Sequence, residues 1–242
     1  MYKVGCIVDA GVGGHVNDDR ALINDSIIEN GYFEKECDEV LAIVCDGVGG
    51  EAFGYEAANT IVTFFSKLNR IDINSNSIVY QLNEANCELL KVRQMDSQYS
   101  RMATTIAGLL LSGNNYLSFN IGDSRTYRFR FPYIAQLSTD HSLAAEMREL
   151  GLEIKPGQEH VITRSLGTED HHPEVVDGTE KLFDQDEFIV CSDGISDAVT
   201  ELDMEDIMKK DCPLREKCEA FIKMAVSKGS KDNLSIIVIT RG

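Results

Sequence analysis

Apolar residues along this chain of 242 residues follow two different spacings. Short runs at 3–8, 22–28 and 40–44 are apolar or rich in β-branched residues, and they predict three strands within the first fifty residues. In the stretches 55–68 and 78–95, apolar residues recur at helical spacing instead, which predicts two amphipathic helices. The chain is therefore expected to place a pair of helices between groups of strands.

The rest of the chain continues this mixture. The expected strands are 104–111, 116–121, 126–137 (a strand or hairpin), 188–191 and 234–240, and the expected helices are 143–150, 205–210 and 214–226. Residues 152–172 lack a clear period and contain three of the five histidines, so we expect a long irregular, flap-like segment there. No low-complexity linker interrupts the sequence, and we predict a single domain over residues 1–242.

The composition is strongly acidic, with 40 Asp and Glu residues against 23 Lys and Arg and a formal net charge of −17. A nucleic-acid partner would require a basic surface, and no Lys/Arg run of that kind is present. The seven cysteines are irregularly spaced without a C-x-x-C pair, which indicates neither a disulfide framework nor a zinc site. No signal peptide opens the chain and no apolar stretch approaches the ~20 residues that span a bilayer. We therefore expect a cytoplasmic protein with no membrane partner.

Two predicted strands end in the same dipeptide, Asp-Gly, at Asp46 and at Asp193. A strand end holds a side chain rigidly while the following loop opens to solvent. Asp-Gly is also a common hairpin turn, and Asp177-Gly178 is interpreted as only that. Further acidic residues follow or precede strands in NDD (17–19), GDSR (122–125) and KDN (231–233). Carboxylates gathered from distant strand ends are typical of a site for Mg²⁺ or Mn²⁺, which prefer oxygen ligands.

The order and spacing of these motifs resemble the metal-dependent protein phosphatase family of type 2C, in its compact bacterial form. The motifs that carry the resemblance, which covers nearly the whole chain, are DGVGG (46–50), ATT (103–105), GDSR (122–125), DHS (140–142), TRSLG (163–167), SDG (192–194) and DN (232–233). The resemblance implies an α+β fold, a four-layer α-β-β-α sandwich in which two central antiparallel sheets are flanked by helix pairs. The metal ions would lie between the sheets at one edge.

The resemblance also implies a role for each acidic position, with Mn²⁺ or Mg²⁺ as the cofactor. Asp46 would bridge two ions, and the carbonyl of Gly47 would bind one of them. Asp193 and Asp232 would hold the other ion, so that Asp46, Asp193 and Asp232 are the expected catalytic residues. Two ions that share a water lower its pKa and so provide hydroxide to attack phosphorus.

Three further acidic positions, Asp123, Asp18 and Asp19, have no role in this pair of sites. Asp123, together with Asp193, would fit a third and weaker metal site. Asp18 and Asp19 occupy the acidic pair that the family has near its N-terminus, and Asp19 is the stronger candidate for a metal contact.

The sequence departs from the family pattern at the expected grip on phosphate. Family members usually have an arginine where this chain has Gly14. His15 or Arg20 could substitute for it, phosphate affinity could be lower, or other phosphoesters could be preferred. Arg164, in the flap-like segment, could reach an incoming phosphoprotein. Val48 stands where some members have a histidine that could protonate the leaving group.

These features favour a serine/threonine phosphoprotein phosphatase that opposes a bacterial Ser/Thr-type kinase and is expected to be monomeric. Neither a Cys-His nor a Ser-His-Asp nucleophile pattern stands out, and His141 and His160 are expected to be structural or flap histidines. Two alternatives stay open. The missing arginine would suit a weak or inactive phosphatase-fold protein that binds phosphoproteins. A phosphohydrolase acting on a small molecule is the other.

Overall fold

Two six-stranded antiparallel sheets form the centre of the computed structural model, which describes residues 1–13, 16–48, 53–68, 74–155, 157–169, 171–178 and 182–241. The first sheet has the order β11 (Tyr133–Gln136), β10 (Arg125–Arg130), β13 (Asp186–Cys191), β14 (Leu234–Arg241), β1 (Tyr2–Asp9) and β4 (Gly31–Cys37). The second has the order β12 (Glu174–Asp177), β9 (Asn115–Ile121), β8 (Ile106–Ser112), β5 (Glu39–Cys45), β2 (Arg20–Ile23) and β3 (Ser26–Ile28). The short strands β6 (Gly47–Val48) and β7 (Ala103–Thr104) form a separate pair.

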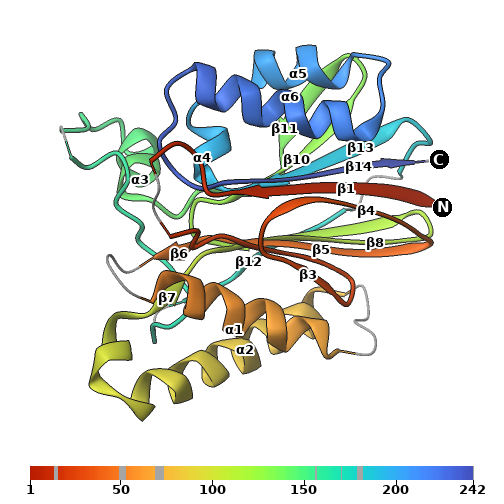
Figure 1. Ribbon diagram of the computed structural model, residues 1–242. Helices are drawn as coiled ribbons and strands as arrows, with labels where there is room; N and C mark the ends of the chain where they lie inside the picture. Colours follow the sequence, from red (N-terminus) through yellow and green to blue (C-terminus); the bar gives the residue numbers. More distant parts are fainter. Residues whose placement is uncertain are drawn as a thin grey trace.

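Helices cover the outer face of each sheet and complete a sandwich of four layers (Figure 1). The helices are α1 (Gly54–Ser66), α2 (Ser75–Met95), α3 (Leu143–Glu149), α4 (Asp193–Ser196), α5 (Glu201–Met208) and α6 (Leu214–Ser227), with a 3-10 turn η1 (Ser97–Arg101). The pair α1 and α2 lies on the second sheet, and the pair α5 and α6 lies on the first (Figure 1). The predicted α+β fold, with two antiparallel sheets between helix pairs, is confirmed.

Strand β5 shows how the sequence produces these layers. Its side chains alternate between the two faces of the sheet, because successive side chains of a strand point in opposite directions. Ile43 and Cys45 join the apolar cluster beneath α1 and α2, whereas Ala42 and Val44 lie in the cluster between the two sheets. Since both faces are covered, the strand is a continuous apolar run and not an alternating one.

The sequence predicted three strands within the first fifty residues, but the structure has more strands there. The run 22–28 was expected to be one strand, but it divides into β2 and β3 around a turn in which Asn24 has a positive φ of 56°. Strand β4 was not predicted at all. It lies at the edge of the first sheet, its residues are all exposed or half-buried, and three of its seven residues are charged, so it lacks an apolar run.

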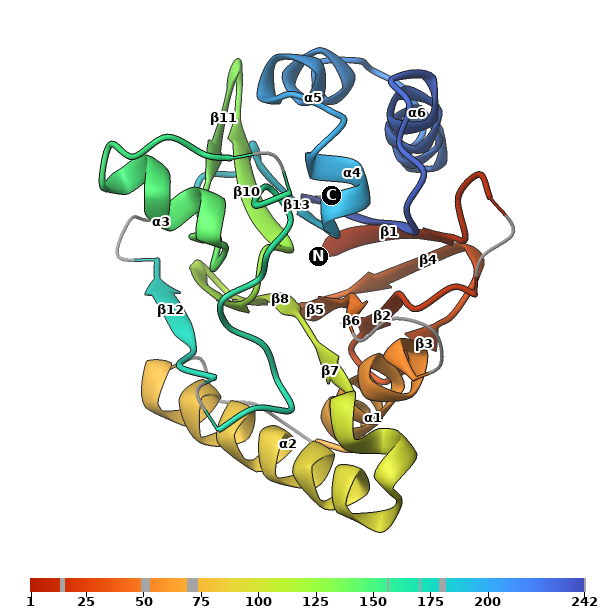
Figure 2. The ribbon, with the colours of Figure 1, turned by 90° about the vertical axis from the view of Figure 1, so that its left-hand side faces the viewer.

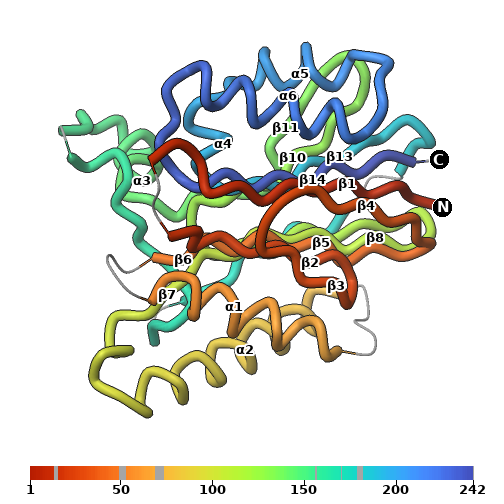
Figure 3. Tube along the Cα trace, in the orientation of Figure 1, coloured from red at the N-terminus to blue at the C-terminus, as the bar shows by residue number. Residues whose placement is uncertain are grey.

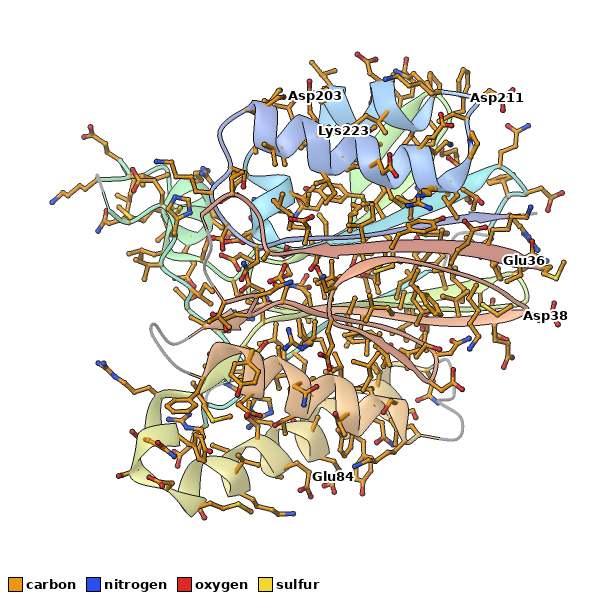
Figure 4. The ribbon with its side chains drawn as sticks, viewed as in Figure 1. Glu36, Asp38, Glu84, Asp203, Asp211 and Lys223 are labelled. Atoms are coloured by element: carbon orange, nitrogen blue, oxygen red, sulfur yellow. The ribbon has the colours of Figure 1, made fainter. Side chains whose placement is uncertain are left out.

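Both termini lie at one end of the sandwich, where β1 pairs with β14, and α3 lies toward the opposite end (Figure 3). Exposed acidic side chains are distributed over the outside of the molecule, with Glu36 and Asp38 at the end that holds the termini and Glu84 on α2 (Figure 4). Within the described part of the chain, none of the helices combines the length and hydrophobicity needed to cross a membrane.

Candidate metal centre

Strand register brings the predicted acidic residues to the end of the sandwich that Figure 2 faces. Arg20, the first residue of β2, pairs with Cys45, the last residue of β5. Asp19 and Asp46 therefore lie beside each other, just beyond the ends of these two strands. In the first sheet, Asp9 pairs with Leu234 and Cys191 pairs with Ile236. Five strand ends therefore converge on one edge, and the residues that they present there are Asp19, Asp46, Asp123, Asp193 and Asp232.

Hydrogen bonds with Thr104, the last residue of β7, and with the following Thr105 hold Asp46 in place directly after β5. Its carbonyl oxygen accepts hydrogen bonds from the backbone N–H of Thr105 and from the hydroxyl of Thr104, both at 2.8 Å. Its own N–H donates to Oγ1 of Thr105 at 3.1 Å. Burial raises the pKa of the Asp46 carboxyl well above its usual range, and the charges of Asp193 and Asp19 raise it further.

Gly47 and Asp18 together fix the start of α1 against this loop. A Cβ atom on Gly47 would lie 2.1 Å from the carbonyl oxygen of Gly54, so only glycine permits this close approach. Oδ1 of Asp18 accepts a hydrogen bond from the N–H of Tyr55 at 2.9 Å, where an unpaired helix N–H needs an acceptor. One oxygen of Asp18 is thus engaged in holding a helix. This agrees with the preference for Asp19 as the metal contact.

Asp19 is almost completely buried, with 1% of its surface exposed. Its Oδ2 accepts a hydrogen bond from the hydroxyl of Ser192 at 2.8 Å, while Oδ1 has no hydrogen-bond partner among the described residues. Burial raises the pKa of Asp19 to about 7, with a further contribution from the charges of Asp193 and Asp232. The described protein groups therefore compensate the negative charge of this buried carboxylate poorly.

Asp193 and Asp123 also have raised pKa values and a buried oxygen without a hydrogen-bond partner. Asp193 is the first residue of α4, and burial together with the charge of Asp232 raises its pKa to about 6. Asp123 follows β9, and burial together with the charge of Asp193 raises its pKa to about 7. Each has a buried Oδ1 atom without a hydrogen-bond partner among the described residues. Asp232 is exposed and its Oδ1 accepts from the N–H of Asn233 at 2.8 Å.

The arrangement as a whole fits divalent cations. Several carboxylates repel one another at a single edge, and three of their buried oxygens have no donor among the described residues. Raised carboxyl pKa values of this kind are expected where a positive charge completes the site. The donors are oxygens, which suits magnesium and manganese. As ligands of individual ions, these residues stay predictions.

The predicted phosphate-binding residues are less well placed. Gly14 and His15 lie outside the described residues. Arg20 is buried, and its Nη1 donates to the carbonyl oxygens of Asn17 at 2.9 Å and Asp19 at 2.6 Å. The guanidinium of Arg20 therefore stabilises the backbone of the loop that contains Asp18 and Asp19. Arg164 is half-buried in the irregular segment, so the binding of phosphate by any of these residues stays a prediction.

His141 has a structural position, as expected from the sequence. It is 4% exposed, its Nδ1 accepts from the N–H of Gly122 at 3.1 Å, and its Nε2 lies 3.3 Å from Oε2 of Glu174. Burial, followed by the charge of Arg164, lowers the pKa of the imidazole. Both ring nitrogens are used to connect the loop after β9 with β12.

The sequence interpretation missed two side chains that support the acidic edge. The side chain of Asn233 accepts from the N–H of Asp18 at 2.9 Å and donates to the carbonyl of Ala10 at 3.1 Å. The hydroxyl of Ser192 donates to Asp19 and accepts from the N–H of Ser235 at 3.0 Å. These contacts join the N-terminal loop to β14. The only signal in the sequence was the presence of Asn233 and Ser192 in the DN and SDG motifs.

Comparison with known proteins agrees with this geometry. The sequence pattern of the family described as protein phosphatase 2C matches residues 14–235. The serine/threonine phosphatase stp of Listeria welshimeri is 29% identical over 236 residues, which cover 92% of this chain and 93% of that protein. The protein phosphatase PhpP of Streptococcus pneumoniae is 28% identical over 221 residues, which cover 86% of this chain and 89% of that protein.

Solved structures show the same fold. The serine/threonine phosphatase of S. agalactiae superimposes with a TM-score of 0.85 at 22% identity, covering 100% of both chains. The catalytic domain of the phosphatase PstP, solved in complex with 2 manganese ions, superimposes with a TM-score of 0.81 at 22% identity and covers 99% of both chains. Since the family pattern spans nearly the whole sequence, this chain belongs to the protein phosphatase 2C family.

Proposed function

We propose that this protein is a metal-dependent serine/threonine phosphoprotein phosphatase whose active site is the acidic edge around Asp46. The observation that carries the proposal is the convergence of carboxylates from five strand ends, three of which have buried oxygens without a donor among the described residues. Membership of the protein phosphatase 2C family supports the same activity. Phosphorylated proteins, substrates of a Ser/Thr-type kinase, are the proposed partners.

Mn²⁺ or Mg²⁺ would be held by residues that the fold already keeps rigid. Asp46 and the carbonyl of Gly47 would contribute from the end of β5, Asp19 from the start of β2, and Asp193 and Asp232 from the ends of strands in the first sheet. Two bound ions would supply an activated water and neutralise charge on the phosphoryl oxygens. The contribution of the chain is orientation, because the bonds of Asp46 to β7 and the bond of Asp19 to Ser192 restrict where their carboxylates point.

A covalent phosphocysteine route is disfavoured by the thiols closest to the site. Cys45 and Cys191 directly precede Asp46 and Ser192, and both are completely buried. Burial raises the pKa of Cys191 to about 12 and that of Cys45 well above its usual value. The thiolate is the nucleophilic form, so neither cysteine is prepared for attack near neutral pH. Direct hydrolysis by water is the reaction that the site favours.

An assay with three substrates tests this proposal. Purified protein should hydrolyse a phosphothreonine peptide and an aryl phosphate when Mn²⁺ is present, lose turnover with a chelator, and act poorly on a phosphotyrosine peptide. Complete lack of metal-dependent turnover would instead favour a phosphoprotein-binding protein. Turnover of the aryl phosphate alone would favour a small-molecule phosphohydrolase.

Because Gly14 stands where the family usually has an arginine, substitution at this position gives a separate test of how the protein binds the substrate phosphate. If uniform phosphate binding is weak in this chain, Gly14→Arg should lower KM for a phosphopeptide more than it changes kcat. Steady-state kinetics with Mn²⁺ would measure both constants. An unchanged KM would mean that another residue already binds the phosphate.

A further inference from the structure

We propose a further metal site in which the imidazole of His160 and the carboxylate of Asp197 act with Asp193 to bind a first-row transition-metal dication. The ligand atoms of these three residues all lie within 4.8 Å of one another. The three residues line one cavity of about 430 Å³, which Asp232 also lines. Because the site shares Asp193 with the proposed active centre, the inference rests in part on the proposed function.

A buried carboxylate beside this cluster gives an independent reason to expect a cation. Asp123 is 8% exposed, and its Oδ1 has no hydrogen-bond partner in the described part of the chain. The charges of Asp193 and Asp197 both act on Asp123, so the three carboxylates are neighbours. The family resemblance already implies a third ion at Asp123 and Asp193. The inference adds His160 and Asp197, and with them a nitrogen ligand.

Helix α4 and Arg125 orient Asp197 toward His160. Asp197 is the C-terminal cap of α4, and its N–H donates to the carbonyl of Asp193 at 2.8 Å, which fixes the two residues on one helical turn. Nη2 of Arg125 lies 3.7 Å from Oδ1 of Asp197 and Nη1 donates to the carbonyl of Ser196 at 3.3 Å. The other oxygen, Oδ2, lies 3.3 Å from Nδ1 of His160. One carboxylate oxygen thus faces the arginine and the other faces the cluster.

The mixed donor set determines which ion would bind. Magnesium prefers an all-oxygen shell, whereas imidazole is a good ligand for transition metals. A site with one imidazole and two or three carboxylates should therefore favour Mn²⁺ or a later dication over Mg²⁺. The main centre, with oxygen donors only, has less reason to discriminate between the two.

Binding at this site would have a structural consequence for the irregular segment. His160 belongs to residues 157–169, in which the described chain forms no helix and no named strand, and its side chain is 74% exposed. Asp193 and Asp197 belong to a helix that contacts β14. An ion shared between them would fasten the segment to α4 at the rim of the active site. Through this site, metal concentration would control how firmly the segment is held beside the cavity that His160 and Asp193 line.

Pulsed electron paramagnetic resonance of the intact Mn²⁺-loaded protein tests the inference directly. A ¹⁴N modulation from a coordinated imidazole should appear in the wild type and disappear in His160→Asn, because the other proposed ligands are oxygens. In Mn²⁺ titrations, His160→Asn and Asp197→Asn should each weaken the last ion to bind by about tenfold or more. Mn²⁺ should also slow proteolysis within residues 157–169 in the wild type and not in these variants.

Matched controls are His172→Asn and Asp206→Asn, which change the same residue types outside the cluster and should behave as wild type. Both His160 and Asp197 have exposed side chains, so the variants should fold, as metal-free melting can verify. Absence of ¹⁴N modulation in the wild type, or its persistence in His160→Asn, would reduce the contact to an ion pair and overturn the inference. The ions that remain in the variants report separately on the proposed active centre.

Discussion

The two Asp-Gly strand ends look alike in sequence but are built differently. After Asp46 the chain stays extended as β6 and pairs with β7, and bonds from Thr104 and Thr105 hold the aspartate. After β13 the chain turns at once into α4, and Asp193 is its first residue. Asp46 is therefore fixed by a neighbouring strand, whereas Asp193 is carried by a short helix.

Glycine serves a similar purpose at both ends, through different partners. A Cβ atom on Gly47 would meet the carbonyl oxygen of Gly54, and one on Gly194 would meet that of Asn233, each at 2.1 Å. The first contact holds α1 against the loop, and the second holds α4 against the start of β14. The comparison teaches that one motif can be positioned by two architectures. The helix after Asp193 also places a further carboxylate, the C-terminal cap Asp197, one turn away.

The largest expected effect is the loss of activity when either aspartate is neutralised. Asp46→Asn and Asp193→Asn should each lower kcat/KM for an aryl phosphate on the order of 10³-fold, because each removes a charge that is proposed to hold metal and would be worth several kcal/mol in the transition state. The variants should remain folded, since asparagine has the same shape and the burial of a negative charge is relieved. Mn²⁺-dependent kinetics and circular dichroism measure the two properties.

A third Asp-Gly pair provides the control for this prediction. Asp177 is the last residue of β12 and is exposed, and the N–H of Gly178 donates to the carbonyl of Tyr116 at 3.0 Å. Asp177→Asn should retain wild-type kinetics. Wild-type activity in Asp46→Asn would contradict the proposed metal role.

An intermediate effect on metal affinity is expected when either of two supporting hydrogen bonds is removed, the one between Thr105 and Asp46 or the one between Ser192 and Asp19. Thr105→Val removes the acceptor for the N–H of Asp46, and Ser192→Ala removes the donor to Asp19. Each should weaken Mn²⁺ binding about tenfold, which is the usual cost of losing a group that orients a ligand. Each should also lower the free energy of unfolding by about 1–3 kcal/mol, because a buried partner is left unsatisfied.

Calorimetric Mn²⁺ titration and urea unfolding would measure these changes, with Ser227→Ala as the control, whose exposed hydroxyl bonds only within α6. If Thr105→Val lost stability but kept full Mn²⁺ affinity, β7 would support the fold and not the orientation of Asp46.

The sequence located the acidic edge well because strand ends are a local feature. An apolar run followed by Asp-Gly identified Asp46 and Asp193 without knowledge of the rest of the chain. The supporting contacts are not local: the bond between Asp18 and Asn233 joins residues 215 positions apart. Edge strand β4 escaped prediction because a half-exposed strand has no apolar run. Patterns therefore predict which residues reach the site, and tertiary contacts decide which of them are free to act there.

The smallest expected effect is on the stability of the metal-free protein at different pH values. In the folded state the pKa of Asp123 is raised to about 7 from its ordinary value of 3.8. The folded protein therefore binds a proton at this carboxyl more tightly than the unfolded chain does. Stability from this group is therefore greatest at low pH and is lost as pH rises from about 4 to about 7. Asp123→Asn carries no such charge and avoids the penalty.

Without metal at pH 8, the variant should melt about 5 °C higher than the wild type, and the difference should shrink steadily as pH falls toward 4. Added Mn²⁺ should narrow the gap at pH 8, because the ion stabilises only the carboxylate form at this position. Calorimetric scans with a chelator and with Mn²⁺ would measure both effects. A variant that melts lower than the wild type at every pH would mean that the Asp123 carboxylate is already compensated by the protein, which would remove the main reason to expect a cation beside it.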